Sequence, residues 1–170
     1  PGKWEVFQPE TFRLKERING VQTISIVGYD KWYLRDFAFT KLNKAFGRLH
    51  PAKYGTIYGD SYEKKENVIE HIGNNVSIAF DGMNFGENGT AKITICGRTP
   101  LTANTIQIRF VGEKESVQVV SFPRSEEYTE LTFDIEQVKG ENQVNFVFLP
   151  GCDFDFEWFM FQENTGIMKD

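Results

Sequence analysis

The feature that most constrains the fold is an alternation of apolar and polar residues with a period of two, repeated along most of the chain. In its clearest run, Ile106, Ile108 and Phe110 alternate with Thr, Gln and Arg. Successive side chains of a strand point to opposite faces of its sheet, so this pattern is typical of a strand with one buried face. The other predicted strands are residues 21–27, 36–42, 54–58, 75–80, 91–96, 117–119, 131–135, 144–149 and 154–161.

Turn-forming residues separate these runs. Asp81-Gly82, residues 85–89, Lys139-Gly140 and Pro150-Gly151 provide the glycine and proline that tight turns need. No helical periodicity lies between the strands, which argues against a parallel α/β sheet. Many short strands with this spacing predict an all-β fold, an antiparallel β-sandwich or jelly roll.

The aromatic content indicates where the core comes from. The 170 residues include 16 Phe but only 3 Trp and 6 Tyr. Phe has no polar group to present to water or to a ligand, so we expect most of these rings inside the sandwich.

Charge and apolar runs exclude two classes of partner. The net charge is −5, and basic residues form no patch or stripe, so no nucleic-acid partner and no anionic membrane surface is expected. No apolar run is long enough to span a membrane. The two cysteines, Cys96 and Cys152, do not amount to a disulfide framework, and free thiols are the simpler expectation.

The first part of the chain has a different character. Residues 1–34 scatter apolar side chains among charges, which indicates a leader or linker from a preceding domain. The predicted strand at 21–27 joins the sandwich or belongs to that neighbour. Residues 35–165 would be the β-sandwich module. The chain begins with Pro-Gly-Lys and not with Met, so we expect it to be part of a longer protein.

Residue patterns for catalysis are missing from the sequence. The only histidines, His50 and His71, lie in no nucleophile motif, and the cysteines and histidines lack metal-ligand spacing. We therefore expect no catalytic residues and no enzymatic activity of this chain by itself.

Three carboxylates alternate near the C-terminus. Asp153, Asp155 and Glu157 would point to one side of the last strand. They can form a solvated polar face, contact a ligand or calcium, or imitate the carboxylate pair of a glycosidase. The solvated face is the simplest of these interpretations.

Two stretches resemble the family 6 carbohydrate-binding modules. Residues 66–69 (Glu-Asn-Val-Ile) and 80–86 (Phe-Asp-Gly-Met-Asn-Phe-Gly) resemble the middle of that family, and residues 148–159 resemble its aromatic–Asn–aromatic–Asp–Trp ending. The match covers about residues 35–162. Residues 28–30, 58–61, 73–77 and 96–98 are also similar to a domain near the C-terminus of bacterial family 2 glycoside hydrolases of the β-galactosidase type.

These resemblances imply a galactose-binding-like sandwich that acts as an accessory domain of a bacterial glycoside hydrolase. It would bind a β-galactoside near the active site of the parent enzyme, and its cellular location would follow that parent. The alternative is a structural domain that packs on neighbouring domains or mediates oligomer contacts without binding sugar. Ser77 and approximately Ser125 stand where the family has its two sugar-stacking aromatic residues.

The resemblance also suggests candidate site residues. We expect a sugar site formed by Tyr62, Asn75, Arg124 and Asp155, with Tyr62 stacking, Asn75 and Arg124 donating hydrogen bonds and Asp155 accepting. Asp155 matches the family's ligand-binding Asn. Asp155 and Glu157 are weak candidates for a structural calcium, because the early strand that would complete that site has no Glu. No other cofactor is expected.

Overall fold

The computed structural model describes residues 12, 21–29, 31, 33–39 and 43–164. The chain divides into two compact units, Pro1–Lys41 and Leu42–Asp170, which are described separately. In the first unit, residues 21–29 and 33–39 form no helix or strand, and most of their apolar side chains are exposed. No helix among the described residues has the length and apolar character needed to cross a membrane.

The second unit consists almost entirely of strands. A short 3-10 helix, η1 (Lys44–Phe46), begins where the side chain of Asn43 accepts from the backbone N of Ala45. One turn of helix, α1 (Pro51–Tyr54), begins with a proline and ends at Gly55. The strands are β1 (Thr56–Tyr58), β2 (Glu63–Lys64), β3 (Ile69–Ile72), β4 (Val76–Asn84), β5 (Thr90–Val111), β6 (Glu115–Val138), β7 (Glu141–Phe148) and β8 (Phe154–Glu163).

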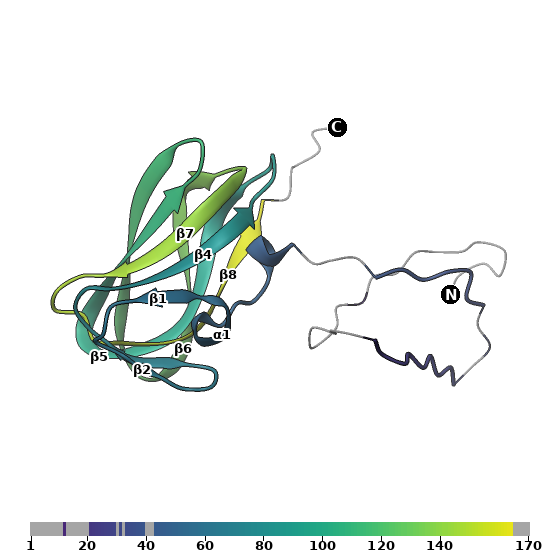
Figure 1. Ribbon diagram of the computed structural model, residues 1–170, viewed down its shortest axis with the longest axis horizontal. Helices are drawn as coiled ribbons and strands as arrows, with labels where there is room; N and C mark the ends of the chain where they lie inside the picture. The colour runs from purple at the N-terminus through teal and green to yellow at the C-terminus, as the bar shows by residue number, and fades with distance from the viewer. Residues whose placement is uncertain (1–11, 13–20, 30, 32, 40–42, 165–170) are drawn as a thin grey trace. The chain divides into compact units, whose positions relative to one another are not determined.

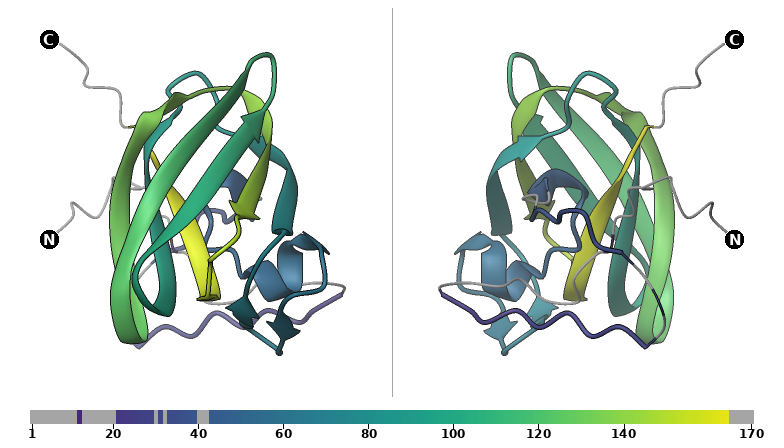
Figure 2. Two further views of the ribbon diagram at one scale, coloured as in Figure 1. Left: turned by 90° about the vertical axis from the view of Figure 1, so that its left-hand side faces the viewer. Right: turned by 90° about the vertical axis from the view of Figure 1, so that its right-hand side faces the viewer.

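The strands form an antiparallel β-sandwich, which confirms the predicted fold class (Figure 1). β5 belongs to both layers: its first half pairs with β8, and its second half pairs with β7. One layer continues from β8 to β3 and β2, and the other continues from β7 to β4 and β1. β6 pairs with β5 along its length and is an edge strand in both layers (Figure 2).

One side chain joins the two halves of β6 on the open side of the sandwich. The amide of Gln118 donates to the carbonyl oxygen of Glu136 at 3.1 Å and accepts from the backbone N of Glu136 at 2.6 Å. This contact reproduces the two hydrogen bonds of a strand pair with one side chain.

The core between the layers is rich in phenylalanine, as the composition predicted. Nine of the sixteen Phe residues are among the largest fully buried side chains. Phe146 occupies the centre, with ring centroids 4.6 Å from Phe159 and 5.1 Å from Phe156. These rings meet tilted or edge to face, the arrangements that aromatic quadrupoles favour.

Several predicted elements need correction. Residues 21–27 and 36–39 form no strand, and residues 40–42 of the predicted strand 36–42 lie outside the described residues. The alternation there is real, but none of the strands in the described part of the chain pairs with it. Tyr54 ends α1 and does not begin β1. Asp81-Gly82 is not a turn: β4 continues through a β-bulge, with Gly82 at a φ of 58°.

The predicted strands 91–96 and 105–110 are parts of the single strand β5, and those at 117–119 and 131–135 are parts of β6. The alternating pattern is interrupted between these runs because β5 and β6 bend there from one layer to the other. β2 and β3 were missed because Glu63–Lys64 and Ile69–Ile72 are too short for a clear alternation.

Truncation of the central ring should reveal how strongly the core depends on it. Phe146→Ala should lower the free energy of unfolding by about 3–5 kcal/mol, because the ring is fully buried and its neighbours cannot fill the cavity. Val119→Thr, at a side chain that is 59% exposed, should change it by less than about 0.5 kcal/mol. Urea unfolding measures the free energy of unfolding of both variants. Equal losses in the two variants would contradict the assigned core.

Candidate functional site

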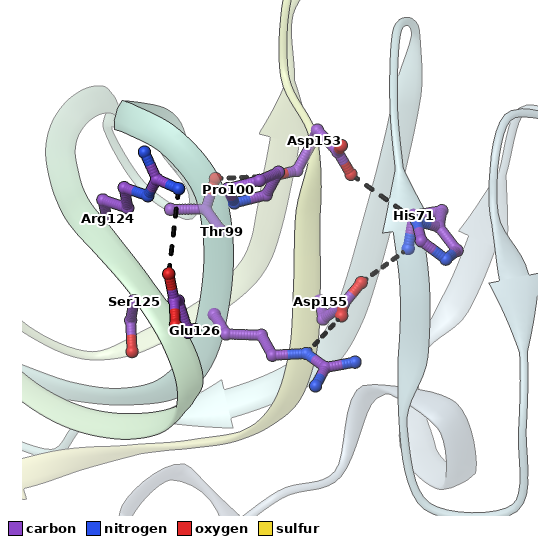
Figure 3. A pocket seen from close by; sticks show the side chains of 9 residues that line it. His71, Thr99, Pro100, Arg124, Ser125, Glu126, Asp153 and Asp155 are labelled. Atoms are coloured by element: carbon purple, nitrogen blue, oxygen red, sulfur yellow. Dashed lines mark hydrogen bonds and ion pairs between the residues drawn. The ribbon is translucent and has the colours of Figure 1, made fainter.

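The candidate site is a hollow of about 290 Å³ at the place where β5 passes from one layer to the other (Figure 3). β3, β5, β6 and the start of β8 surround it. Its lining consists of His71, Arg98, Thr99, Pro100, Arg124, Ser125, Glu126, Asp153 and Asp155.

The bend of β5 shapes the floor of this hollow. The pairing of β5 with β6 shifts register between Gly97 and Thr99, and again between Thr99 and Ala103. Gly97 lets β5 approach β8 closely, since a Cβ there would lie 2.2 Å from Cζ of Phe154. The hydroxyl of Thr99 donates to the carbonyl oxygen of Asp153 at 2.6 Å, which ties the bend to the residues before β8.

A bulge in β3 forms the opposite wall. Ile69 pairs with Phe156 and Ile72 pairs with Phe154, so β3 has one residue more than β8 between these pairs. Glu70 and His71 therefore both lie opposite Asp155. His71 has a φ of 53°, in the left-handed region that residues with a side chain rarely adopt.

Asp155 joins these two walls and is not part of a solvated face. It is only 7% exposed. Its Oδ1 accepts from the backbone N of His71 at 2.7 Å, and its Oδ2 accepts from Nε of Arg98 at 2.6 Å. The simplest interpretation of the three alternating carboxylates was wrong for Asp155, because the bulge in β3 and the Arg98 side chain cover it.

Arg98 is the centre of a network of charged and polar side chains. Its guanidinium lies over the ring of Tyr128, 4.6 Å from the centroid, and 3.4 Å from Oε1 of Glu70. Lys65 pairs with the other oxygen of Glu70, and the Tyr128 hydroxyl donates to Oε1 at 3.1 Å. These contacts hold the Arg98 side chain in place at the edge of the hollow.

The network shifts the ionisation of its members. Hydrogen bonds from Lys65 and Tyr128 hold the pKa of Glu70 below its usual value. The hydrogen bond to Asp155 raises the pKa of Arg98. Burial, with the Asp155 charge nearby, raises the pKa of Tyr128. Glu70, Arg98 and Tyr128 therefore keep their ordinary charge states at neutral pH.

The rim of the hollow is more exposed. Nη2 of Arg124 lies 3.8 Å from Oε1 of Glu126, and these side chains are 62% and 86% exposed. Nδ1 of His71 lies 3.7 Å from Oδ1 of Asp153. Figure 3 shows Arg124 and Glu126 on β6 across the hollow from His71. The rim thus presents separate hydrogen-bond donors and acceptors to a ligand.

The structure brings together two of the four predicted site residues. Arg124 and Asp155 both line the hollow, whereas Tyr62 and Asn75 do not contribute to its lining. Tyr62 is partly buried against the core, and Asn75 is an exposed turn residue with a φ of 60°. The expected roles of these four residues stay predictions. Of the two serines at the family's aromatic positions, Ser125 lines the hollow and Ser77 lies on β4.

Sequence reasoning missed Arg98 and His71. No local motif marks Arg98, because its role depends on a strand 57 positions away. The positive φ of His71 lies in the bulge where β3 has one residue more than its partner β8. The sequence of either strand alone does not show this mismatch.

The predicted calcium ligands have other partners. Each oxygen of Asp155 accepts a hydrogen bond from a protein donor, and its role as a calcium ligand stays a prediction. Oε2 of Glu157 accepts from the Cys96 thiol at 3.2 Å, and burial with this contact raises the pKa of Cys96 to about 12. Within the described residues, Glu63, Glu70 and His71 form a group of potential metal ligands, but Lys65 and Arg98 already neutralise Glu70.

Comparison with known proteins shows similarity in structure only. No protein-family model matches the chain, and no curated protein matches it. The module CsCBM6-3 from Clostridium stercorarium, solved with cellobiose, is 21% identical with a TM-score of 0.60. The alignment covers 70% of this chain and 95% of that module.

Two further structures are similar. A family 6 carbohydrate-binding module from Clostridium cellulolyticum, solved with xylose, is 19% identical with a TM-score of 0.56, over 70% of this chain and 98% of that one. A family 43 arabinoxylan arabinofuranohydrolase from Bacillus subtilis, solved with cellotetraose, is 16% identical with a TM-score of 0.57. There the alignment covers 70% of this chain but only 27% of the enzyme.

Removal of the Asp155 carboxylate should destabilise the fold. Asp155→Ala should lower the free energy of unfolding by about 2 kcal/mol or more, because Arg98 and the His71 backbone N both lose a charged acceptor. Asp153→Ala, which removes a more exposed carboxylate on the same hollow, should cost less than about 1 kcal/mol. Thermal melts compare them, and an unchanged melting point for Asp155→Ala would contradict this role.

The lowered pKa of Glu70 should appear in the pH dependence of stability. The ionised Glu70 contributes its full stabilisation at a pH above 4.5, the pKa of the carboxyl group in the unfolded chain. This contribution is lost as the pH falls through the lower pKa of the folded state. From about pH 7 to about pH 3, the wild-type protein should therefore lose more unfolding free energy than Glu70→Gln. Glu87→Gln, in an exposed turn, is the control and should follow the wild-type curve; parallel curves for all three proteins would refute the prediction.

These structural neighbours, each aligned over 70% of the chain, show that its antiparallel sandwich has the fold of the family 6 carbohydrate-binding modules.

Proposed function

We propose that this domain is a carbohydrate-binding accessory module and that it binds sugar in the hollow between β3, β5 and β6. The observation that carries the proposal is the balance of charge around the hollow. Two guanidinium groups, from Arg98 and Arg124, face three carboxylates, from Glu126, Asp153 and Asp155. Hydrogen-bond donors and acceptors therefore both surround the space, with a small excess of negative charge.

This arrangement suits a ligand with many hydroxyl groups. Each hydroxyl both donates and accepts, so it can bridge a carboxylate and a guanidinium. Hydrogen bonds to charged groups are roughly twice as strong as those between neutral groups. An anion such as phosphate would gain little here, because carboxylates outnumber guanidinium groups among the lining residues.

The size of the hollow limits the ligand. A volume of about 290 Å³ is at the lower end of the range for small-molecule sites. It fits one sugar unit or the end of a chain better than the middle of an extended polysaccharide. The lining contains none of the described Trp, Tyr or Phe side chains, so binding would depend on hydrogen bonds and would be weak.

The identities of the sugar and of the parent protein are part of the same proposal. The sequence resemblance suggests a β-galactoside as the ligand and a glycoside hydrolase of the β-galactosidase type as the parent protein. A module of this kind would hold substrate near the parent's active site. The structural neighbours were solved with cellobiose, xylose and cellotetraose, so the ligand test compares gluco, xylo and galacto sugars.

A two-dimensional NMR titration of this chain tests the proposal. Galactose, lactose, a longer β-galactoside, cellobiose and xylose are added up to the millimolar range. Amide shifts confined to residues around Arg98, Arg124 and Asp155 would support it, and the sugar with the largest shifts would identify the specificity. No shift with any of these sugars would refute it.

A matched pair of arginine variants separates binding from stability. Arg124→Ala should weaken sugar binding about tenfold, because it removes a charged donor from the rim. Its exposed contact with Glu126 contributes little to stability, so the melting point should stay the same. Arg109→Ala removes another exposed arginine, on β5 outside the hollow, and should leave binding unchanged. Equal affinities of the two variants would contradict the assigned site.

One observation favours an interface role for the first unit. In residues 21–39, Val27, Phe37 and Phe39 are 58–68% exposed, which is costly unless a neighbouring domain covers them. An absence of sugar binding, together with tight association of this chain with another domain of the parent protein, would make docking the main function.

A further inference from the structure

We infer that His71 is a ligand-contacting residue, presented to the hollow by the bulge in β3. This inference rests on the proposed sugar-binding function and adds a residue that determines affinity at that site. Neither the sequence analysis nor the family resemblance assigned a role to this side chain.

The backbone conformation of His71 is unfavourable for a residue with a side chain. His71 has a φ of 53° within a strand, where an L-residue with a side chain is strained by roughly 1–3 kcal/mol. Glycine adopts this conformation without that strain. Among the described residues, the only other non-glycine with a positive φ is Asn75, a turn residue of a type that tolerates it well. The sequence therefore keeps an imidazole where glycine would be easier to accommodate.

The fold uses the backbone of His71 and leaves most of its side chain exposed to a ligand. The backbone N donates to Asp155 at 2.7 Å, a contact that any residue except proline can make. The side chain is 64% exposed. Its polar neighbours are Asp153, at 3.7 Å, and the carboxylates of Glu63 and Glu70, within 4.8 Å. Nothing in the packing of the core requires a ring at this position.

The bulge in β3 lies next to the hollow. A bulge changes the direction of a side chain, and bulges are frequent next to binding sites. Here the extra residue in β3 places Glu70 with Arg98 and Tyr128, and it places His71 at the hollow. The same extra residue thus completes the supporting network and supplies a group at the rim.

The chemistry of imidazole suits this location. It offers a flat ring that can lie against the C–H face of a sugar, and a nitrogen that donates to or accepts from a hydroxyl. Since the lining lacks a larger aromatic ring among the described residues, His71 is the planar group that the hollow provides from β3. Arg124 and Glu126 would contact the ligand from the opposite side.

Two substitutions at this position test the inference with the sugar that binds best in the NMR titration. His71→Gly should weaken binding about tenfold, the effect of losing one good polar contact. Its melting point should stay at or above the wild-type value, because the φ of 53° no longer carries strain. His71→Asn tolerates the same backbone conformation but lacks the ring, and it should also bind more weakly.

Two controls accompany these variants. His50→Asn removes an imidazole outside the hollow and should bind as the wild-type protein does. Asn75→Gly introduces glycine at the other described non-glycine residue with a positive φ. Its melting point shows how much glycine alone changes stability in such a conformation.

The outcomes separate this inference from the proposed function. Failure of the wild-type protein to bind any sugar overturns both. Wild-type binding with undiminished affinity in His71→Gly and His71→Asn overturns the role of His71 alone. Loss of binding in His71→Gly with a strongly lowered melting point also overturns it, because the residue would then be structural.

Discussion

The structure depends on the passage of one strand between two layers. β5 begins beside β8 and ends beside β7, so a single run of backbone holds both faces of the core together. The bend at residues 97–103 makes this possible, because glycine permits close approach to β8 and the register with β6 shifts twice. The hollow is a geometric result of the same bend: a strand that leaves one sheet for another opens a space beside it, and the neighbouring strands line that space.

The charges at the bend stabilise this arrangement. Buried carboxylates are costly unless they accept hydrogen bonds from donors or cations, and Asp155 and Glu70 both do. The Arg98 guanidinium contacts both carboxylates, and the Tyr128 ring packs against its flat face. Such a preformed network keeps polar groups at fixed positions, which reduces the ordering that a ligand would otherwise have to impose.

Local pattern predicted the fold class and most of the strands that form the core. The alternation at residues 105–110 and the Phe-rich ending are local signals. Residues 105–110 have one buried face, whereas most of β8 is buried on both faces. The candidate site was less accessible from the sequence. Arg124 and Asp155 were proposed through resemblance, and both line the hollow. The conformation of His71 depends on how β3 aligns with β8, and the position of Arg98 depends on the bend. At residues 21–27 the local pattern predicted a strand that the structure does not contain, since alternation alone does not make a strand without a partner.

The place of β6 at the edge of both layers has a consequence for solubility. An open strand edge is a template for pairing with another chain, and natural proteins protect such edges with charge. The second half of β6 has acidic side chains at Glu126, Glu127, Glu130, Asp134 and Glu136. Antiparallel pairing of two copies through this segment would bring carboxylates against carboxylates. The edge that the fold leaves open is therefore protected by electrostatic repulsion against self-association into larger aggregates.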